Sequence, residues 1–316
     1  GKKMATKQDQ TKKILKKLSK EEIGRITLEL SKIPLFKASE AVILTEEHRA
    51  VMVKQISEKY EEIFKLAKLD YINDENLKDT PMRVASMYIN ELMIGRYSSA
   101  PRIEAFPANY YNIIQQDMAY DNEDMLYAEK AAKDIHIKLD EITEKFYKYS
   151  DIDPVISNLL LKEADKLLTE LMEHEERFLP KVSNKSMVVK TVDVNSLCSH
   201  HFIPFVSTDE KDSRAVIAYV PRLGSDKALL GISKLQRIMD YFGRRPQLQE
   251  TLNWQVKTFI SLILRSQNVM VSFHNIVHYC EKTRGVESHC GTTSSSEYSG
   301  LYNKQEYRDL AFSLIK

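Results

Sequence analysis

The stretch SMVVKTVDVNSLCSHHFIPF, residues 186–205, combines a strand pattern with three side chains that can bind a metal ion. Valine and threonine alternate with polar residues over 186–197, and this period of two predicts a β-strand. Cys198, His200 and His201 lie within four positions at the end of this strand. A C-x-x-H pair can direct a thiolate and an imidazole at one zinc ion. One such pair is weak evidence by itself.

A second cluster lies further along the chain, in NIVHYCEKTRG at 275–285. His278 and Cys280 are two positions apart, so on one strand their side chains would share a face. If the two strands converge, Cys198, His201 and Cys280 supply three ligands and leave a fourth position for water. Three protein ligands with an open position are typical of catalytic zinc sites, whereas structural sites are usually closed by four.

The two remaining histidines, His200 and His278, would then lie near the ion and move protons, because imidazole titrates near neutral pH. Two alternatives stay open. Cys290, beside His289, could compete as a ligand, or the cysteines could be small buried hydrophobic residues with the histidines as hydrogen-bonded fillers. The chain has only three cysteines, an odd and sparse set that argues against a disulfide framework.

A third cluster, GISKLQRIMDYFGRRPQLQE at 231–250, predicts an anion site. Ser233, Lys234 and Arg237 fall on the first turns of a helix, where the backbone N–H groups and the basic side chains favour a polyphosphate. Gln249 and Glu250 offer the amide and carboxylate that a guanine edge requires, and Arg83 and Arg284 could join the phosphate site. Each charge alone is more often a solvated surface residue, but their clustering beside the metal motifs favours a site.

The order of the remaining elements predicts an α+β protein. After residue 200 a strand at 214–221 is followed by helices at 233–242 and 247–265, a strand at 269–280 and a Ser/Thr-rich segment. This order favours an antiparallel sheet with helices packed on one face. Upstream, the pattern predicts an amphipathic helix over 46–69. A second helix follows it; Asp79 or Thr80 would cap this helix, Pro81 would lie in its first turn, and Gly95 would end it. A strand is predicted next, over 101–107.

Two segments fall outside this core. The Lys-rich segment at 1–45 has only a partial apolar stripe, which favours a solvated helix or tail over a basic docking arm. Within 111–185, apolar residues recur at steps of three and four from Ala128 to Tyr149 and from Ile156 to Leu171, typical of an antiparallel helical hairpin. The turn SDIDP provides Asp153 as N-cap and Pro154 at the first helical position. Either the hairpin packs on itself, or it binds a partner or stabilises an oligomer.

The chain is therefore predicted to consist of an extension at 1–45, N-terminal helices and a first strand at 46–110, the hairpin at 111–185 and the zinc-binding core at 186–316. Lys+Arg number 46 against Asp+Glu 45, so no net charge attracts nucleic acid or an anionic membrane. No apolar run approaches the roughly 20 residues of a membrane helix. We expect a cytoplasmic protein with neither nucleic acid nor membrane as a partner.

Together these motifs resemble the GTP cyclohydrolase I family. The resemblance covers roughly residues 46–110 and 186–310. Its similar stretches are DTPMRVASMYINELMIG at 79–95, CSHHFIPF at 198–205, GISKLQRI at 231–238, RRPQLQE at 244–250 and VHYCEKTRG at 277–285. It implies a tunnelling fold, zinc as the cofactor, and pentamers stacked into a homodecamer with active sites at subunit interfaces.

The resemblance also implies a role for each motif residue. Zinc would be held by Cys198, His201 and Cys280. The catalytic residues would be His200, His278, Gln249 and Ser233, and GTP would be bound by Glu250, Lys234, Arg237, Arg284 and Arg83. Gln249 and Glu250 would lie at the guanine, and Arg83 would reach in from a neighbouring subunit. The implied reaction adds water at C8 of GTP, opens the imidazole ring, releases formate and closes a pterin ring as 7,8-dihydroneopterin triphosphate. The product would serve folate, biopterin or modified-guanine synthesis.

Three features depart from the family pattern. Ser199 occupies a position where the family usually has Glu, and Ser86 occupies a position where the family commonly has a basic residue. The insertion at 111–185 replaces what is a hairpin turn in the family. Two other functions remain as alternatives. A tunnelling-fold nitrile reductase would need a nucleophilic cysteine elsewhere and no zinc triad. A non-catalytic, zinc-stabilised scaffold would recruit a partner through the hairpin, although every inferred catalytic position is still occupied.

Overall fold

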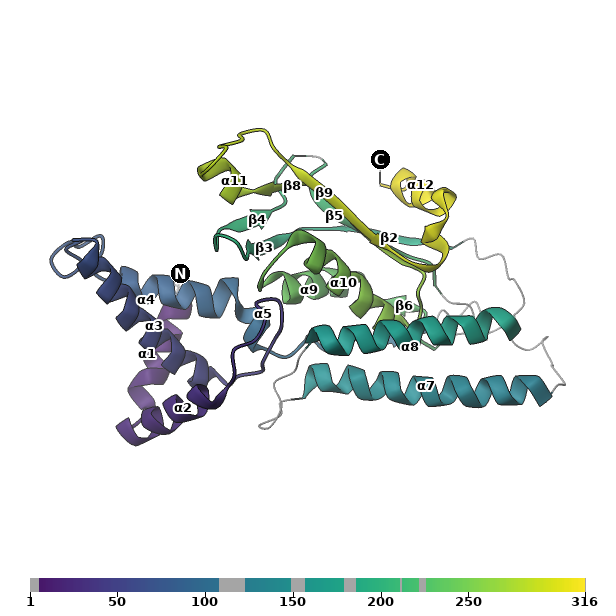
Figure 1. Ribbon diagram of the computed structural model, residues 1–316, viewed down its shortest axis with the longest axis horizontal. Helices are drawn as coiled ribbons and strands as arrows, with labels where there is room; N and C mark the ends of the chain where they lie inside the picture. Colours follow the sequence, from purple (N-terminus) through teal and green to yellow (C-terminus); the bar gives the residue numbers. More distant parts are fainter. Residues whose placement is uncertain are drawn as a thin grey trace, which may run out of the picture.

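The computed structural model describes residues 6–107, 123–148, 157–178, 186–210, 212–221 and 226–315. A sheet in the order β2-β5-β8-β4-β3-β7, with β9 paired to β8, forms its centre (Figure 1). All pairings are antiparallel except the parallel contact of β3 with β7. The strands are β2 Val188–Val192, β3 Asn195–Cys198, β4 Pro204–Val206, β5 Arg214–Tyr219, β7 Pro246–Gln247, β8 Val269–His278 and β9 Thr293–Tyr298. The predicted α+β class is confirmed.

The strand predicted over 186–197 is two strands. At the break, the Asp193 N–H donates to Gln236 Oε1 at 2.8 Å and the Asp193 carbonyl accepts from Gln236 Nε2 at 3.1 Å. A helix side chain therefore replaces a strand as the hydrogen-bond partner at this point. As a result β2 pairs with β5, while β3 continues to β4.

The sheet carries helices on both faces, not on one as the sequence predicted. Helices α9 (Ile232–Gly243) and α10 (Gln249–Leu264) cover one face, where Ile217 of β5 joins the main core. Ala218, the next residue along β5, belongs to a smaller core with the C-terminal helix α12 (Gln305–Ser313). Figure 1 shows α12 and α10 on opposite sides of the sheet. The alternation of strand side chains thus buries β5 on both faces.

The predicted N-terminal helices are present as α3 (Glu46–Leu66) and α4 (Thr80–Met87). α4 continues into a π-helix, η1 (Tyr88–Leu92), and a short helix, α5 (Ile94–Tyr97). Asp79 makes no side-chain cap; its carboxylate pairs with Lys12 at 3.3 Å instead. Gly95 is required, because a Cβ there would lie 2.0 Å from the Tyr241 carbonyl oxygen of α9. This close contact joins the N-terminal helices to the sheet layer.

The Lys-rich extension forms two helices that are solvated over most of their surface, as expected for a solvated helix, but each also packs along one narrow face. α1 (Lys7–Lys17) and α2 (Lys20–Lys32) each begin with a capping box, and both pack on α3. Thr11 and Ile26 are buried at these contacts. Thr11 also accepts a hydrogen bond from Asn90 of η1 at 3.1 Å. The polar face of the extension is solvated, but its narrow apolar face is covered.

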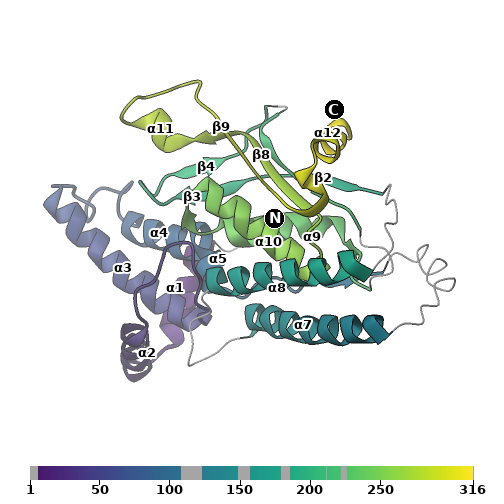
Figure 2. The same ribbon diagram turned by 45° about the vertical axis from the view of Figure 1, so that its right-hand side comes forward.

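The predicted hairpin helices are present as α7 (Glu123–Tyr147) and α8 (Ser157–Phe178). α8 lies between α7 and α10 in both views (Figure 1, Figure 2). The hairpin's apolar residues join the same core as the sheet, for example where Phe146 meets Phe259 of α10 with ring centroids 5.2 Å apart. Buried seam residues include Ile135, Leu139, Ile142, Ala164, Leu167 and Leu171. The predicted positions Ala128, Tyr149, Asp153, Pro154 and Ile156 lie outside the described side chains.

The hairpin therefore packs on the core as well as on itself. A two-stranded sheet of β1 (Ala105–Phe106) and β6 (Leu229–Leu230) joins the N-terminal segment to the main core, and it is shorter than the strand predicted over 101–107. Within the described ranges, no helix has the length and apolarity needed to cross a lipid bilayer.

Candidate metal centre

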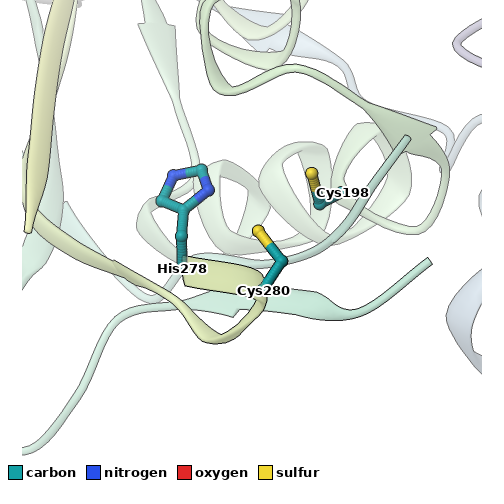
Figure 3. Close-up of side chains that lie close together, drawn as sticks. All are labelled: Cys198, His278 and Cys280. Atoms are coloured by element: carbon teal, nitrogen blue, oxygen red, sulfur yellow. The ribbon is translucent and has the colours of Figure 1, made fainter. Parts of the chain in front are cut away.

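Two cysteines and one histidine meet where β3, β4 and β8 lie side by side. The ligand atoms of Cys198, His278 and Cys280 all lie within 4.8 Å of one another. Figure 3 shows the two sulfur atoms and the imidazole grouped around one space. Two strands distant in sequence thus converge as the motifs predicted.

Strand register explains this convergence. β3 pairs with β4 through Leu197 and Pro204, and β4 pairs with β8 through Phe205 and His278. Cys198 is therefore at the end of one strand and His278 at the end of its second neighbour. The chain leaves β8 after His278, and Cys280 lies on the short helix α11 (Tyr279–Thr283). The prediction that His278 and Cys280 share a strand face was wrong, because β8 ends at His278. The turn into α11, not the alternation of a strand, brings the Cys280 thiol to the site.

The imidazole of His278 is held on two sides. Its ring stacks on Phe205, with centroids 4.8 Å apart and planes 8° from parallel. Its Nε2 lies 2.9 Å from Oε1 of Gln249, the first residue of α10. Burial lowers the pKa of His278, and the opposing influence of Glu250 and Glu281 is smaller. The ring is thus favoured in its neutral form, the form that can bind a metal ion or accept a proton.

The two thiols suit a soft or borderline cation. Cys198 is buried and Cys280 is half-buried. Burial raises the pKa of Cys280, and the neighbouring sulfur of Cys198 raises it further. A cation between the sulfurs would reverse both effects, because it stabilises the thiolates. Two thiolates and an imidazole are the donor set that zinc accepts, so the residues fit that ion.

His200 and His201 lie beside this group on the turn between β3 and β4, and both are exposed. Nδ1 of His200 is 3.9 Å from the Cys198 sulfur, and the two histidine rings are 6.3 Å apart. The structure groups His278, not His201, with the two cysteines. The assignment of His201 as the third ligand therefore stays a prediction, and His278 is a second candidate for that position.

The histidine turn has one anchor that sequence reasoning missed. The hydroxyl of Tyr88, the first residue of η1, donates to the Phe202 carbonyl at 3.1 Å, and the two rings lie 6.2 Å apart. Phe202 has a φ of 54°, a left-handed conformation that costs a non-glycine residue energy. Tyr88 thus links the helix that carries Arg83 to the turn that carries both histidines. Its polar hydroxyl within the apolar face of that helix was the available signal.

The predicted anion site occupies the start of α9, after its N-cap Gly231. Ser233 and Arg237 are exposed there and Lys234 is half-buried. Glu250 is exposed yet close enough to raise the pKa of His278. Arg83 on α4 and Arg284 after α11 are both exposed. The binding roles of these residues remain predictions.

Gln249 differs from the other predicted substrate residues, because its side chain is only 2% exposed. Its amide bonds His278 on one side and Ser295 of β9 on the other. The predicted contact of Gln249 with guanine stays untested, but in this structure the amide serves the histidine. Cys290 and His289 are exposed on the loop after α11, outside the Cys198 group.

An α+β fold with a half-buried thiol–imidazole group at the meeting of three strands defines a candidate metalloenzyme. Comparison with known sequences gives the family. The family model for GTP cyclohydrolase I matches residues 157–316, about half of the chain, and starts at the first residue of α8. The chain belongs to the GTP cyclohydrolase I family of enzymes, as its motifs predicted.

Curated bacterial relatives agree with this assignment. GTP cyclohydrolase 1 of Pectobacterium carotovorum is 26% identical over 254 residues, which cover 80% of this chain and 78% of the relative. The enzyme of the same name from Serratia proteamaculans is 26% identical over 259 residues, covering 82% and 80%. That of Salmonella choleraesuis is 26% identical over 246 residues, covering 78% and 73%.

Proposed function

We propose that the chain converts GTP into 7,8-dihydroneopterin triphosphate and formate in a zinc-dependent reaction. The observation that carries this proposal is the convergence of Cys198, His278 and Cys280 within 4.8 Å in a chain of this family. Bound zinc lowers the pKa of a coordinated water to about 7 and so supplies a nucleophile at neutral pH. The donor set at the centre fits such an ion.

The protein's own residues would bind the nucleotide and move its protons. Lys234 and Arg237 at the start of α9 would hold the triphosphate, where the helix N-terminus and both cations favour an anion. Ser233 would contact the ribose next to them, and Glu250 would accept hydrogen bonds from the guanine edge. His200 follows β3 on the turn next to Cys198 and His278 ends β8, so each would transfer a proton at the purine ring.

We propose further that the active unit is a homodecamer, with sites at subunit interfaces. Arg83 lies exposed on α4, and Arg284 lies exposed beyond α11, so both are available to a triphosphate bound between copies of the chain. Size measurement by light scattering tests the assembly. A fully active monomer would contradict the interface model.

The direct test is incubation of zinc-loaded protein with GTP. We expect release of formate and a product that becomes a fluorescent pterin after oxidation. Cys280→Ala should lose both zinc and turnover, while Cys290→Ala, the third cysteine on an exposed loop, serves as the matched control and should keep them. If the zinc-loaded wild-type protein releases no formate, the catalytic proposal fails.

The two histidines next to the cysteines are separated by a second pair of variants. We expect His201→Ala to lose zinc and His278→Ala to keep zinc but lose turnover, since His278 is proposed to carry protons. Metal content is measured by atomic emission on each purified variant. Zinc retained in His201→Ala and lost in His278→Ala would assign the third ligand position to His278.

A further inference from the structure

The Gln249 amide is fixed by partners on both of its ends. Its Nε2 donates to Ser295 Oγ at 2.9 Å and to the backbone carbonyl of Thr293 at 3.4 Å. Its Oε1 lies 2.9 Å from His278 Nε2. The side chain is almost fully buried, so water does not compete freely for these contacts.

These partners determine which way the amide points. A backbone carbonyl only accepts hydrogen bonds, so the Thr293 oxygen requires the NH2 end of Gln249 beside it. Ser295 Oγ also receives the side-chain amide of Asn253, itself fully buried, at 3.3 Å, so its oxygen serves as a shared acceptor. The flipped amide would instead place the Gln249 side-chain oxygen against the Thr293 carbonyl oxygen at about the same 3.4 Å, where neither group can donate a hydrogen.

The same reasoning extends to the histidine ring. With its NH2 end toward β9, Gln249 presents Oε1 to His278, and an amide oxygen only accepts. Nε2 of His278 must therefore carry a hydrogen, and the neutral ring keeps its lone pair on Nδ1. The stack on Phe205, which is fully buried, holds the ring plane, and the contact of Nε2 with Gln249 fixes which edge of the ring faces the amide.

We propose that Ser295 and Asn253 are positioning residues that act through Gln249 to hold His278 as the Nε2–H tautomer. The nitrogen left for a metal ion or a proton beside the two cysteines is then Nδ1. The tautomer follows from the contacts alone, whereas its effect on turnover rests on the proposed function. β9, which the sequence showed only as a Ser/Thr-rich segment, thus takes part in the site.

The tautomer can be measured directly. Full-length protein with ¹⁵N-labelled histidine is studied by magic-angle-spinning NMR well above the ordinary histidine pKa, with His278→Ala used to assign the signals. We expect His278 of the wild-type protein to have a protonated Nε2 and an unprotonated Nδ1. Nδ1–H in the wild-type protein would overturn the proposal. This readout does not depend on GTP turnover.

Variants of the network test its direction. Gln249→Leu removes the acceptor and should yield a mixture of tautomers, whereas Gln249→Glu keeps an acceptor and should preserve Nε2–H. Ser295→Ala should populate the other tautomer in part. Ser296→Ala is the matched control, because this neighbouring hydroxyl bonds Ser272 at 2.6 Å instead, and it should leave His278 unchanged. Equal spectra for Gln249→Leu and the wild type would refute the role of Gln249.

Kinetics separate this inference from the proposed function. Ser295 contacts Gln249, not substrate, so Ser295→Ala should lower kcat on the order of 10-fold with little change in KM, the size typical of residues that orient a metal-site histidine. If the wild-type protein does not convert GTP, the proposed function fails while the tautomer result stands. If turnover occurs but Ser295→Ala and Ser296→Ala have equal kcat and equal spectra, the positioning role fails alone.

Discussion

One half-buried ion pair joins the helical hairpin to the core beside the apolar contacts, and breaking it should destabilise the protein. Nζ of Lys257 on α10 lies 3.3 Å from Oδ1 of Asp165 on α8, with the two side chains 6% and 39% exposed respectively. Gln267 also donates to the same carboxylate at 3.3 Å. Asp165→Ala removes the paired carboxylate of a buried cation.

The size of the loss follows from the burial of the pair. Removing one partner of a fully buried ion pair costs about 3–5 kcal/mol, because the other charge is left uncompensated. Asp165 is partly exposed, so water screens part of this interaction. Glu297 on β9 also acts on Lys257: burial raises the pKa of Glu297 and Lys257 lowers it. We therefore expect Asp165→Ala to reduce the free energy of unfolding by about 2 kcal/mol.

Urea denaturation at fixed protein concentration measures this change, since an oligomer's stability varies with concentration. Asp134→Ala, at an exposed position on α7, is the matched control and should change stability by less than about 0.5 kcal/mol. The double variant Asp165→Leu/Lys257→Met should recover to within about 1 kcal/mol of the wild type, because it removes both charges. Equal stabilities of Asp165→Ala and Asp134→Ala would refute the reasoning.

Three further changes test the turn, the close packing and the metal. Tyr88→Phe removes a hydrogen bond worth about 1 kcal/mol and should lower GTP turnover about fivefold. The hydroxyl of Tyr71 bonds Glu61 instead, so Tyr71→Phe is the control and should leave turnover unchanged. Equal rates of the two variants would contradict an anchoring role for Tyr88. Gly95→Ala forces a Cβ onto a backbone oxygen and should cost about 3 kcal/mol in a urea titration; a wild-type midpoint would show that the contact relaxes. Treatment with a strong chelator should abolish turnover, and zinc should restore it; activity that survives complete metal removal would argue against zinc dependence.

The sequence predicted most elements with regular periodicity. The seam residues of α7 and α8 recur at helical spacing, and Leu139 and Ala164 are fully buried in the structure. The strand that leads to Cys198 was predicted from the alternation of β-branched and polar residues, and the strand that carries His278 was placed at 269–280 in the expected order of elements. These features depend on local patterns, which a single sequence displays.

The errors occurred where composition concealed a local signal. The Lys-rich segment looked solvated, yet Thr6 with Asp9 and Ser19 with Glu22 form capping boxes that mark two helix starts. Such caps are visible in the sequence and were available as evidence for ordered helices. The covering of both sheet faces was missed for a different reason, since β5 reads as an apolar run that fits several packings.

The geometry of the site could be predicted only in part, because it depends on long-range contacts. The motifs indicated that Cys198, Cys280 and a histidine meet, but the turn after β8 determines which histidine is nearest. The pairing of Gln249 with Ser295 joins positions 46 residues apart in sequence. No local pattern marks such a pair, so the partner of His278 emerged only from the three-dimensional structure.

These contacts relate the two candidate roles of His278 to each other. If Gln249 holds the hydrogen on Nε2, both metal binding and proton transfer must use Nδ1, and one nitrogen cannot do both at once. If His201 is the third ligand, Nδ1 of His278 is free for the substrate. If His278 binds the ion instead, His200 must move the protons. The metal content of the two alanine variants therefore determines the ligand and, with it, the residue that carries protons.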